Sequence, residues 1–366
     1  MRVLFSSRRN LFTAPGGDTV QLVKTAEQLR LLGVHVDINT EDTPNLEGYD
    51  LVHLFNLMRP QEIYSQAKNA KLQGKQIALS TIYGLYTEFE RKARGGLPGW
   101  LAKHLTVWQI ERAKVLARIF SSKEAGFGSW LVAFSGYWRI CSKTLEMVDI
   151  CLPNSHSEMQ RVQVDFPQTS NMPYVVVPNA ADENLFSAVA ECESVPLTDF
   201  VLCVARIEGR KCQLELVRAM KSIDADLVII GQAAPNHQKY YEAVKREASF
   251  RVHFLGQMSQ QDLIKYYSAA KVHALVSWME TPGLSSLEAA AMGCNIVVTE
   301  KGDTRDYFGD AAFYCKTNDI GSITNALRRA LNSEKKSSLQ SKIKAEYSWG
   351  NAAEQTLAGY KVVLDC

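Results

Sequence analysis

The sequence predicts an α/β fold made of two Rossmann-like domains, each a doubly wound parallel sheet, which face each other across a cleft. At 366 residues, the chain is longer than a single hydrophobic core usually serves. Short apolar runs alternate with segments of helical periodicity, first over 1–81 and again from residue 200 onward. We therefore predict an N-terminal domain over 1–180 and a C-terminal domain over 181–350, with a polar linker at 183–199. A last helix over 351–366 is expected to pack back on the first domain.

The first domain begins with the pattern of a parallel-sheet unit. The apolar run 1–5 is followed by a polar loop with Gly16 and Gly17, then by a helical pattern that Gly33 ends, with apolar residues at Val20, Val23, Ala26, Leu29 and Leu32. The loop follows the carboxyl end of the first strand, where open α/β sheets bind ligands. Two glycines there would let a ligand approach the backbone closely, although a glycine pair before a helix is also a routine tight turn.

Further apolar runs predict the remaining strands. They lie at 34–38, 50–55, 76–81, 147–152 and 174–177 in the first half, and at 200–205, 227–230, 251–255, 272–276 and 296–299 in the second. His53 lies inside one of these runs, and we interpret it as a buried core histidine.

The composition excludes several classes of function. A formal net charge of +2 is too small for a globally basic nucleic-acid-binding protein. No apolar run is long enough to cross a bilayer, and the sequence opens directly into a strand with no signal-peptide pattern, so a cytoplasmic location is expected. The eight cysteines are scattered without metal-ligand spacing, so we expect buried thiols and no structural metal.

The segment 84–143 differs from the rest of the chain. It holds ten Lys and Arg residues against four Glu, and four of the six tryptophans: Trp100, Trp108, Trp130 and Trp138. Cations interleaved with such aromatics suit an anionic membrane surface or a lipid-linked substrate. A solvated helical insertion with core aromatics is the alternative interpretation.

The stretch 278–293 is the strongest candidate for a functional site. Glu280 and Glu288 are separated by seven residues that include a Thr-Pro-Gly turn and the predicted start of a helix over 284–292. The free amides at that start would attract a phosphate. The alternative is that Ser285 and Glu288 only form a capping box, with Ser285 or Ser286 at the helix cap.

Together these segments resemble the retaining glycosyltransferases of family 4, which have the GT-B fold. The family's E-x7-E motif resembles Glu280 to Glu288, and A-R-I-E-G-R-K resembles its strand-end arginine and a lysine five residues on, which are Arg206 and Lys211 here. P-G-G-D-T-V-Q is similar to the family's N-terminal glycine loop at Gly16 and Gly17. The resemblance covers nearly the whole chain outside 84–143 and is strongest over 200–314.

The resemblance implies a metal-independent transfer of sugar from a nucleoside-diphosphate donor, without a cofactor, to a cell-surface glycan or lipid-linked acceptor. Arg206 and Lys211 would stabilise the diphosphate, helped by the amides of three residues: Gly283, Leu284 and Ser285. Glu288 would accept the ribose hydroxyls, and Glu280 would lie by the transferred sugar. No nucleic acid is expected as a partner.

The chain departs from the family pattern at one place near the expected donor sugar. The strand over 76–81 ends in S-T-I-Y, where the family commonly has a histidine, so Tyr83 is expected to replace it as a sugar or acceptor contact. The missing histidine also leaves open a protein that binds nucleotide sugars without catalysis. A dinucleotide oxidoreductase is disfavoured because no G-x-G-x-x-G follows either first strand.

Overall fold

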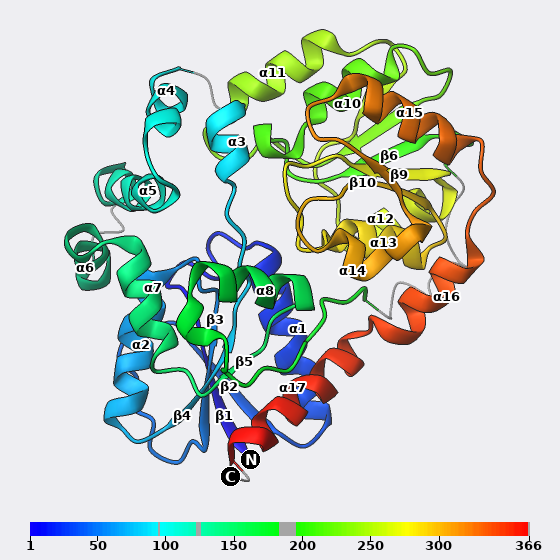
Figure 1. Cartoon of the computed structure of the whole chain (residues 1–366). Coiled ribbons are helices and arrows are strands. Elements are labelled where there is room, and N and C mark those ends of the chain that lie inside the picture. The colour runs from blue at the N-terminus through cyan, green and yellow to red at the C-terminus, as the bar shows by residue number, and fades with distance from the viewer. Residues whose placement is uncertain (94–95, 122–125, 183–194, 365–366) are drawn as a thin grey trace. The chain divides into compact units, whose positions relative to one another are not determined.

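The computed structural model describes residues 1–93, 96–121, 126–182 and 195–364, and its chain forms two compact units (Figure 1). Unit 1 comprises Met1–Arg91, Gly95–Asn179 and Trp349–Cys366, and unit 2 comprises Lys92–Arg94 and Ala180–Ser348. Every strand pair described is parallel. The predicted fold class, with two doubly wound α/β domains, is confirmed. Most of the predicted linker, 183–194, lies outside the described residues.

Unit 1 has a five-stranded sheet in the order β2-β1-β3-β4-β5. Its strands are β1 (Arg2–Ser6), β2 (His35–Asn39), β3 (Leu51–Phe55), β4 (Gln76–Ser80) and β5 (Ile150–Cys151). The connections leave β1 toward one edge and β3 toward the other, so the carboxyl ends of β1 and β3 form the point where the strand order reverses. The predicted strand over 174–177 is wrong: Tyr174 makes only an isolated bridge with Cys151, although the Val177 amide also donates to the Pro153 carbonyl at 2.8 Å.

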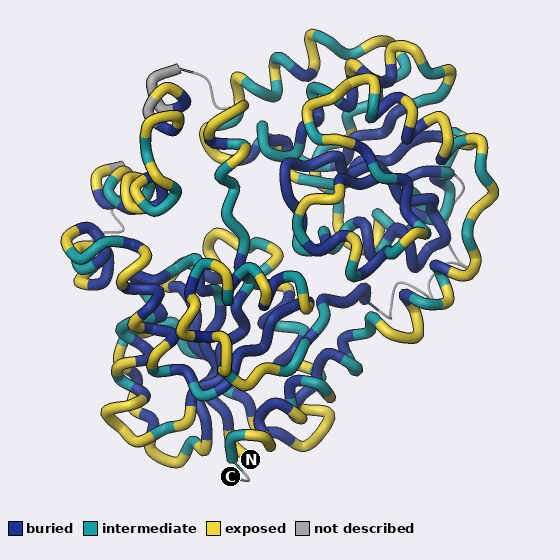
Figure 2. The backbone as a smooth tube through the Cα atoms, in the orientation of Figure 1, coloured by how far each residue is buried: buried dark blue, intermediate teal, exposed yellow. Residues whose placement is uncertain are grey.

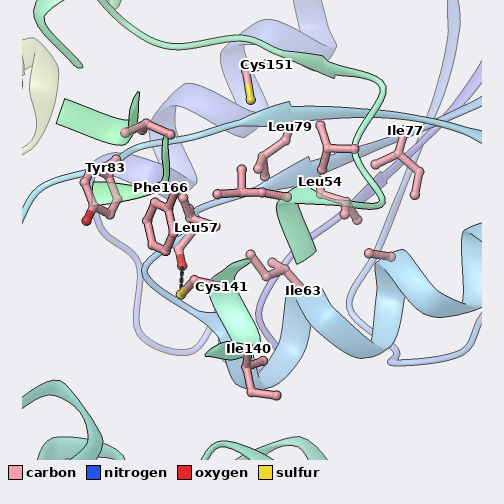
Figure 3. Packing of buried hydrophobic residues seen from close by; sticks show 14 of the residues in the cluster. Leu54, Leu57, Ile63, Ile77, Leu79, Tyr83, Ile140, Cys141, Cys151 and Phe166 are labelled. Carbon is pink, nitrogen blue, oxygen red and sulfur yellow. Dashed lines mark hydrogen bonds between the residues drawn. The ribbon is translucent and has the colours of Figure 1, made fainter. Parts of the chain in front are cut away.

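Helices cover both faces of this sheet, and the alternation of its side chains shows which. Leu54 and Leu79 point into a cluster with α2 (Pro60–Leu72) and α7 (Tyr137–Leu145), part of which is drawn in Figure 3. His53 precedes Leu54 on β3 and therefore points to the opposite face, where it contacts Tyr360 of α17 (Trp349–Leu364). There α17 packs against α1 (Gly17–Leu31), whereas α8 (His156–Asp165) contributes Met159 and Val162 to the cluster with α2 and α7.

Two predictions about this face have different outcomes. His53 is a core histidine as predicted, since it is fully buried between the Tyr360 hydroxyl at 2.7 Å and Ser80 Oγ at 2.9 Å, and burial lowers its pKa to about 3. The phase predicted for α1 is wrong at both ends, because Val20 and Leu32 are exposed. The buried face of α1 keeps Ala26 and Leu29 of the predicted pattern and adds Leu22 with three polar residues that the pattern omits: Thr19, Gln21 and Thr25.

The segment 84–143 forms short helices, which belong to unit 1 except for Lys92–Arg94. Their bounds are α3 (Thr87–Lys92), α4 (Gly96–His104), α5 (Val107–Ser121), α6 (Phe127–Ser135) and α7. Lys114 joins α3 to α5, since its Nζ lies 2.9 Å from Glu90 Oε1 and 2.7 Å from Glu111 Oε1. Trp108 packs into the core, whereas Trp100 is exposed. The position of Trp108 agrees with an insertion that has core aromatics, and the membrane-surface interpretation stays a prediction.

Unit 2 has a six-stranded sheet in the order β11-β10-β9-β6-β7-β8, which is the strand order of the Rossmann fold. Its strands are β6 (Val201–Val204), β7 (Leu227–Ile230), β8 (Val252–Phe254), β9 (Val272–Leu275), β10 (Asn295–Thr299) and β11 (Phe313–Cys315). Its helices are α10 (Gln213–Met220), α11 (Gln238–Glu247), α12 (Gln260–Ala269), α13 (Leu284–Ala291), α14 (Thr304–Phe308), α15 (Ile320–Leu331) and α16 (Ser337–Glu346). The sheet interior of each unit is buried (Figure 2).

Candidate functional site

The candidate site lies where the strand order of unit 2 reverses, between β6 and β9. These neighbouring parallel strands send their chains in opposite directions across the sheet, so their carboxyl-end loops separate and leave a crevice. The loop after β6 carries Arg206 and Lys211, and the loop after β9 carries Glu280 and Gly283. Parallel pairing alone therefore brings together two motifs about seventy residues apart in the sequence.

Two contacts join these loops. The amide of Trp278 donates to the carbonyl of Arg210 at 2.9 Å, and the Lys211 ammonium forms a hydrogen-bonded ion pair with Glu280 Oε1. Glu280 is only 6% exposed, and the Lys211 side chain is 18% exposed. A buried carboxylate is costly without a partner, so Lys211 is the cation that permits Glu280 to be there.

The loop after β6 is shaped to present its cations. Gly209–Lys211 forms a 3-10 turn, and Cys212 then adopts the left-handed conformation with φ of 55°. Gln213 Nε2 donates to the Arg206 carbonyl at 2.9 Å, which fixes the backbone at the end of β6. The Arg206 side chain is exposed and forms no ion pair with any described residue, whereas Arg210 pairs with Glu208 at 2.7 Å.

The backbone of Glu280 is held from the neighbouring strand. Its amide donates to the Lys301 carbonyl at 3.2 Å, and its carbonyl accepts from the Asp303 amide at 2.9 Å. Gly302 has φ of 92°, and a Cβ there would lie 1.9 Å from the Glu280 carbonyl oxygen. The loop after β10 therefore sets the position of Glu280, and Gly302 is required for that close approach. A glycine and an aspartate in the loop after a parallel strand are the sequence signal for this support.

Gly283 begins α13 and lies beside the Glu280 carboxylate. Its φ is 88°, and a Cβ would lie 3.3 Å from Glu280 Oε2 and 2.9 Å from Leu275 Cδ2. The amides of Leu284 and Ser285 in the first helical turn have no carbonyl four residues earlier within the helix to accept from them. The helix start therefore offers donors and the positive end of its dipole next to the ion pair.

The predicted cap of this helix is wrong. Gly283 is the N-cap and no side chain caps the helix, so Ser285 and Glu288 do not form a capping box. Ser286 is buried, with its Oγ 3.4 Å from His273 Nδ1. The helix begins at Leu284, as in the predicted range 284–292, so only the cap residue differs from the prediction.

Glu288 lies one helical turn further along α13. The Tyr267 hydroxyl donates to its Oε2 at 2.8 Å, and Gln260 Nε2 donates to its Oε1 at 3.1 Å. Burial raises the pKa of Glu288 to about 7, and these two hydrogen bonds lower it. Both donors come from α12, which packs beside α13, and neither was identified from the sequence.

Gly16 and Gly17 lie in unit 1, after β1 and at the start of α1. The Gly16 amide donates to Thr19 Oγ1 at 3.1 Å, and Arg8 organises the rest of the loop. Arg8 pairs with Asp18 at 2.7 and 3.0 Å and donates to the Ala14 carbonyl at 3.0 Å. Burial would raise the pKa of Asp18, but the Arg8 hydrogen bonds and charge lower it below its usual value. An arginine among the polar residues after the first strand gave no signal of this role.

Tyr83 does not support the sugar or acceptor contact predicted for it. The ring is buried beside Phe166 in the core cluster (Figure 3), and its hydroxyl donates to Asp165 Oδ2 at 2.7 Å. Burial and this hydrogen bond raise the pKa of Tyr83. The chain turns sharply before it, because the half-buried Ile82 has φ of 42° while buried Glu158 accepts from the Thr81 hydroxyl and the Tyr83 amide. This turn directs Tyr83 inward and leaves Ile82 at the end of β4.

The described residues show neither a metal-binding cluster nor a membrane-spanning helix. No group of three or more His, Cys, Asp and Glu side chains there is arranged to hold a metal ion. None of the helices in those ranges combines the length and apolar character needed to cross a membrane.

Comparison with known sequences agrees with this geometry. Residues 195–347 match the model for glycosyl transferases group 1. The chain is 25% identical to the D-inositol 3-phosphate glycosyltransferase of Corynebacterium urealyticum, over 94% of this chain and 90% of that one. It is 27% identical to the O-antigen chain mannosyltransferase B of Escherichia coli, over 45% and 46% of the two chains.

Solved structures share the fold at low identity. Sucrose-phosphate synthase from Thermosynechococcus elongatus has a TM-score of 0.72 at 17% identity and covers 100% of this chain and 99% of its own. Anabaena HepE in complex with UDP and glucose has a TM-score of 0.69 at 15% identity and covers 99% of this chain and 100% of its own.

Proposed function

We propose that this chain is a GT-B glycosyltransferase similar to family 4, which transfers a sugar, with retention of anomeric configuration, from a nucleoside-diphosphate donor bound by unit 2. The match of residues 195–347 to the model for glycosyl transferases group 1 and the similarity to named glycosyltransferases support this proposal. The observation that carries the proposal is the Lys211–Glu280 ion pair, set between the ends of β6 and β9 and beside the start of α13. It combines a cation, a carboxylate and free amides within one crevice.

The cations and amides suit the diphosphate. Breaking the glycosidic bond leaves negative charge on the leaving nucleoside diphosphate, and fixed cations stabilise that charge without a metal ion. Lys211 has three N–H donors, so it keeps Glu280 while it donates to a phosphate oxygen. Arg206 supplies a second, exposed cation from the same loop, and the amides of Gly283, Leu284 and Ser285 add donors at the helix start.

The two glutamates suit the parts of the donor that carry hydroxyl groups. Glu280 accepts hydroxyls of the transferred sugar and stabilises the positive charge that develops at the anomeric carbon. Glu288, held by Tyr267 and Gln260, accepts the ribose hydroxyls. The acceptor hydroxyl attacks from the side of the leaving phosphate, whose oxygen takes its proton, so positioning and electrostatics supply the rate enhancement. Gly16 and Gly17 admit a ligand at the carboxyl end of β1.

The acceptor is a cell-surface glycan or a lipid-linked sugar, and the enzyme works in the cytoplasm at the inner face of the membrane. Support comes from the cation- and tryptophan-rich segment 84–143. One relative, the Escherichia coli protein, is named an O-antigen chain mannosyltransferase, and two solved neighbours bind UDP or UDP-glucose.

A donor screen followed by kinetics tests the proposal. UDP-, GDP- and ADP-sugars are compared by thermal shift, because a donor at 100 times its Kd stabilises the fold by about 2.7 kcal/mol. With the donor identified, Lys211→Ala and Glu280→Gln should each reduce transfer or donor hydrolysis by several orders of magnitude. Lys221→Ala removes an exposed lysine paired with Glu247 and is the matched control. Near-normal activity in a folded Lys211 or Glu280 variant would remove the role given to that residue.

One observation favours a second candidate, a nucleotide-sugar-binding protein without catalysis. The family histidine is missing, and Tyr83, which the sequence offers in its place, is turned into the core. Binding of a donor with no turnover, with or without acceptors, would favour this candidate.

A further inference from the structure

The outer face of α6 is an aromatic surface that the reaction proposed above does not use. Phe127, Trp130 and Phe134 follow at i, i+3 and i+7, so they share one side of the helix, and their exposures are 75%, 40% and 79%. Trp130 stacks on Phe134 at 6.0 Å and meets Phe120 of α5 edge-on at 6.3 Å. Phe120 is 78% exposed. We call these four side chains the α6 aromatic face.

The rest of the unit holds this face outward. The opposite side of α6 is buried, and α6 packs against α2. A Cβ at Gly128 would lie 1.7 Å from the Gln61 carbonyl oxygen, so only glycine lets α6 lie this close to the start of α2. Figure 1 shows α6 at the outer edge of unit 1. A helix fixed on one side and apolar on the other presents a preformed docking surface.

Arginines lie beside α6, and α6 itself carries no charged residue. The sequence has no charged residue or histidine over 125–138. A guanidinium lies at each end of α6: Arg112 Nε donates to the Ala133 carbonyl at 2.6 Å, and Arg9 NH1 lies 3.4 Å from the Cβ position of Gly126. Both arginines are exposed, although Arg9 also pairs with Asp42.

The geometry points to an anionic lipid bilayer as the partner, with the α6 aromatic face inserted at the level of the headgroups. Phe and Trp side chains partition into this interface, and arginines at its border bind lipid phosphates. A second copy of the chain is a poorer partner, because a self-association of α6 would bring the same arginines together. This inference rests on the proposed function for the nature of the acceptor. It assigns membrane binding to the α6 aromatic face and its two arginines, where the proposed function relied on the overall charge of 84–143.

Vesicle sedimentation tests the inference with the full chain. Vesicles of phosphatidylcholine alone are compared with vesicles that also contain phosphatidylglycerol. The wild type should bind the anionic vesicles, and Phe127→Ser/Trp130→Ser/Phe134→Ser should lower the partition coefficient at least tenfold. Arg9→Gln/Arg112→Gln should reduce binding and flatten its dependence on salt. Phe250→Ser changes an equally exposed phenylalanine in unit 2 and should bind normally.

The remaining measurements separate the possible failures. The triple variant changes exposed side chains, so its circular dichroism and its hydrolysis of a soluble donor should match the wild type. Lys211→Ala should lose hydrolysis and still bind vesicles, so the two proposals fail independently. Equal vesicle binding by the wild type and the triple variant would overturn the inference. A dimer in light scattering that the triple variant abolishes, without vesicle binding by the wild type, would also overturn it.

Discussion

Removal of one hydroxyl, in Tyr267→Phe, tests the role of Glu288. The Tyr267 hydroxyl donates to Glu288 Oε2 at 2.8 Å, and this bond favours the ionised carboxylate. Since the pKa of Glu288 is about 7, roughly half of the molecules hold it ionised at neutral pH. A hydrogen bond to a charged group contributes about 1.5–3 kcal/mol, so its loss shifts the balance toward the protonated form by about ten- to a hundredfold.

The expected consequence is a displaced pH profile. At neutral pH the ionised fraction falls from roughly a half to a tenth or less, so kcat/KM for the donor should fall about fivefold or more. Raising the pH should restore it, because the carboxylate then ionises without the hydroxyl. The assay is release of the nucleoside diphosphate as a function of pH, with Tyr266→Phe as the control, since that hydroxyl does not bond to Glu288. Two results would refute the reasoning: an acid limb of the kcat/KM profile at the same pH in the wild type and in Tyr267→Phe, or a loss of kcat/KM that high pH does not restore.

Three further predictions concern stability. Tyr83→Phe removes the hydrogen bond to Asp165 and should lower the unfolding free energy by about 1 kcal/mol with kcat unchanged. A large fall in kcat would instead support the contact between Tyr83 and the sugar. Arg8→Met leaves Asp18 without its buried partner and should cost about 3 kcal/mol or more in urea denaturation, whereas Arg9→Met at an exposed pair should cost under about 1 kcal/mol. Glu288→Gln should stabilise the ligand-free protein by about 1–3 kcal/mol above pH 7. Burial raises the pKa of Glu288 from 4.5 to about 7 in the folded state. The wild type therefore loses stability as the pH rises from 4.5 to about 7, because the carboxyl ionises more readily in the unfolded chain. A stability difference that is constant with pH would contradict the last prediction.

The features that follow from chain periodicity were predictable from the sequence. Short apolar runs between helical segments gave the two parallel sheets, and the carboxyl ends of their strands gave the location of Lys211 and Glu280. Lys211 and Glu280 pair because β6 and β9 are neighbouring strands. The resemblance to the family pattern already implied that the two motifs lie together.

Features that depend on contacts between side chains distant in the sequence could not be predicted. The pattern of α1 was misread because its buried face includes polar residues such as Gln21, whose amide bonds to Asn154 at 2.8 Å. Tyr83 was assigned outward because nothing local reveals the left-handed turn at Ile82. Arg8, Tyr267 and Gln260 were missed because each acts through a partner that only tertiary structure brings near.

The Lys211–Glu280 pair has a consequence for discrimination among anions. Without a donor, the lysine is already neutralised by the protein's own carboxylate. Inorganic phosphate can compete for the lysine but offers no sugar hydroxyls to the carboxylate, and it repels the glutamate's charge. On the proposed function, a nucleotide sugar gives the lysine a phosphate oxygen and the glutamate sugar hydroxyls at the same time, while the ion pair stays in place. The pair should therefore favour a ligand that carries both groups over a simple phosphate.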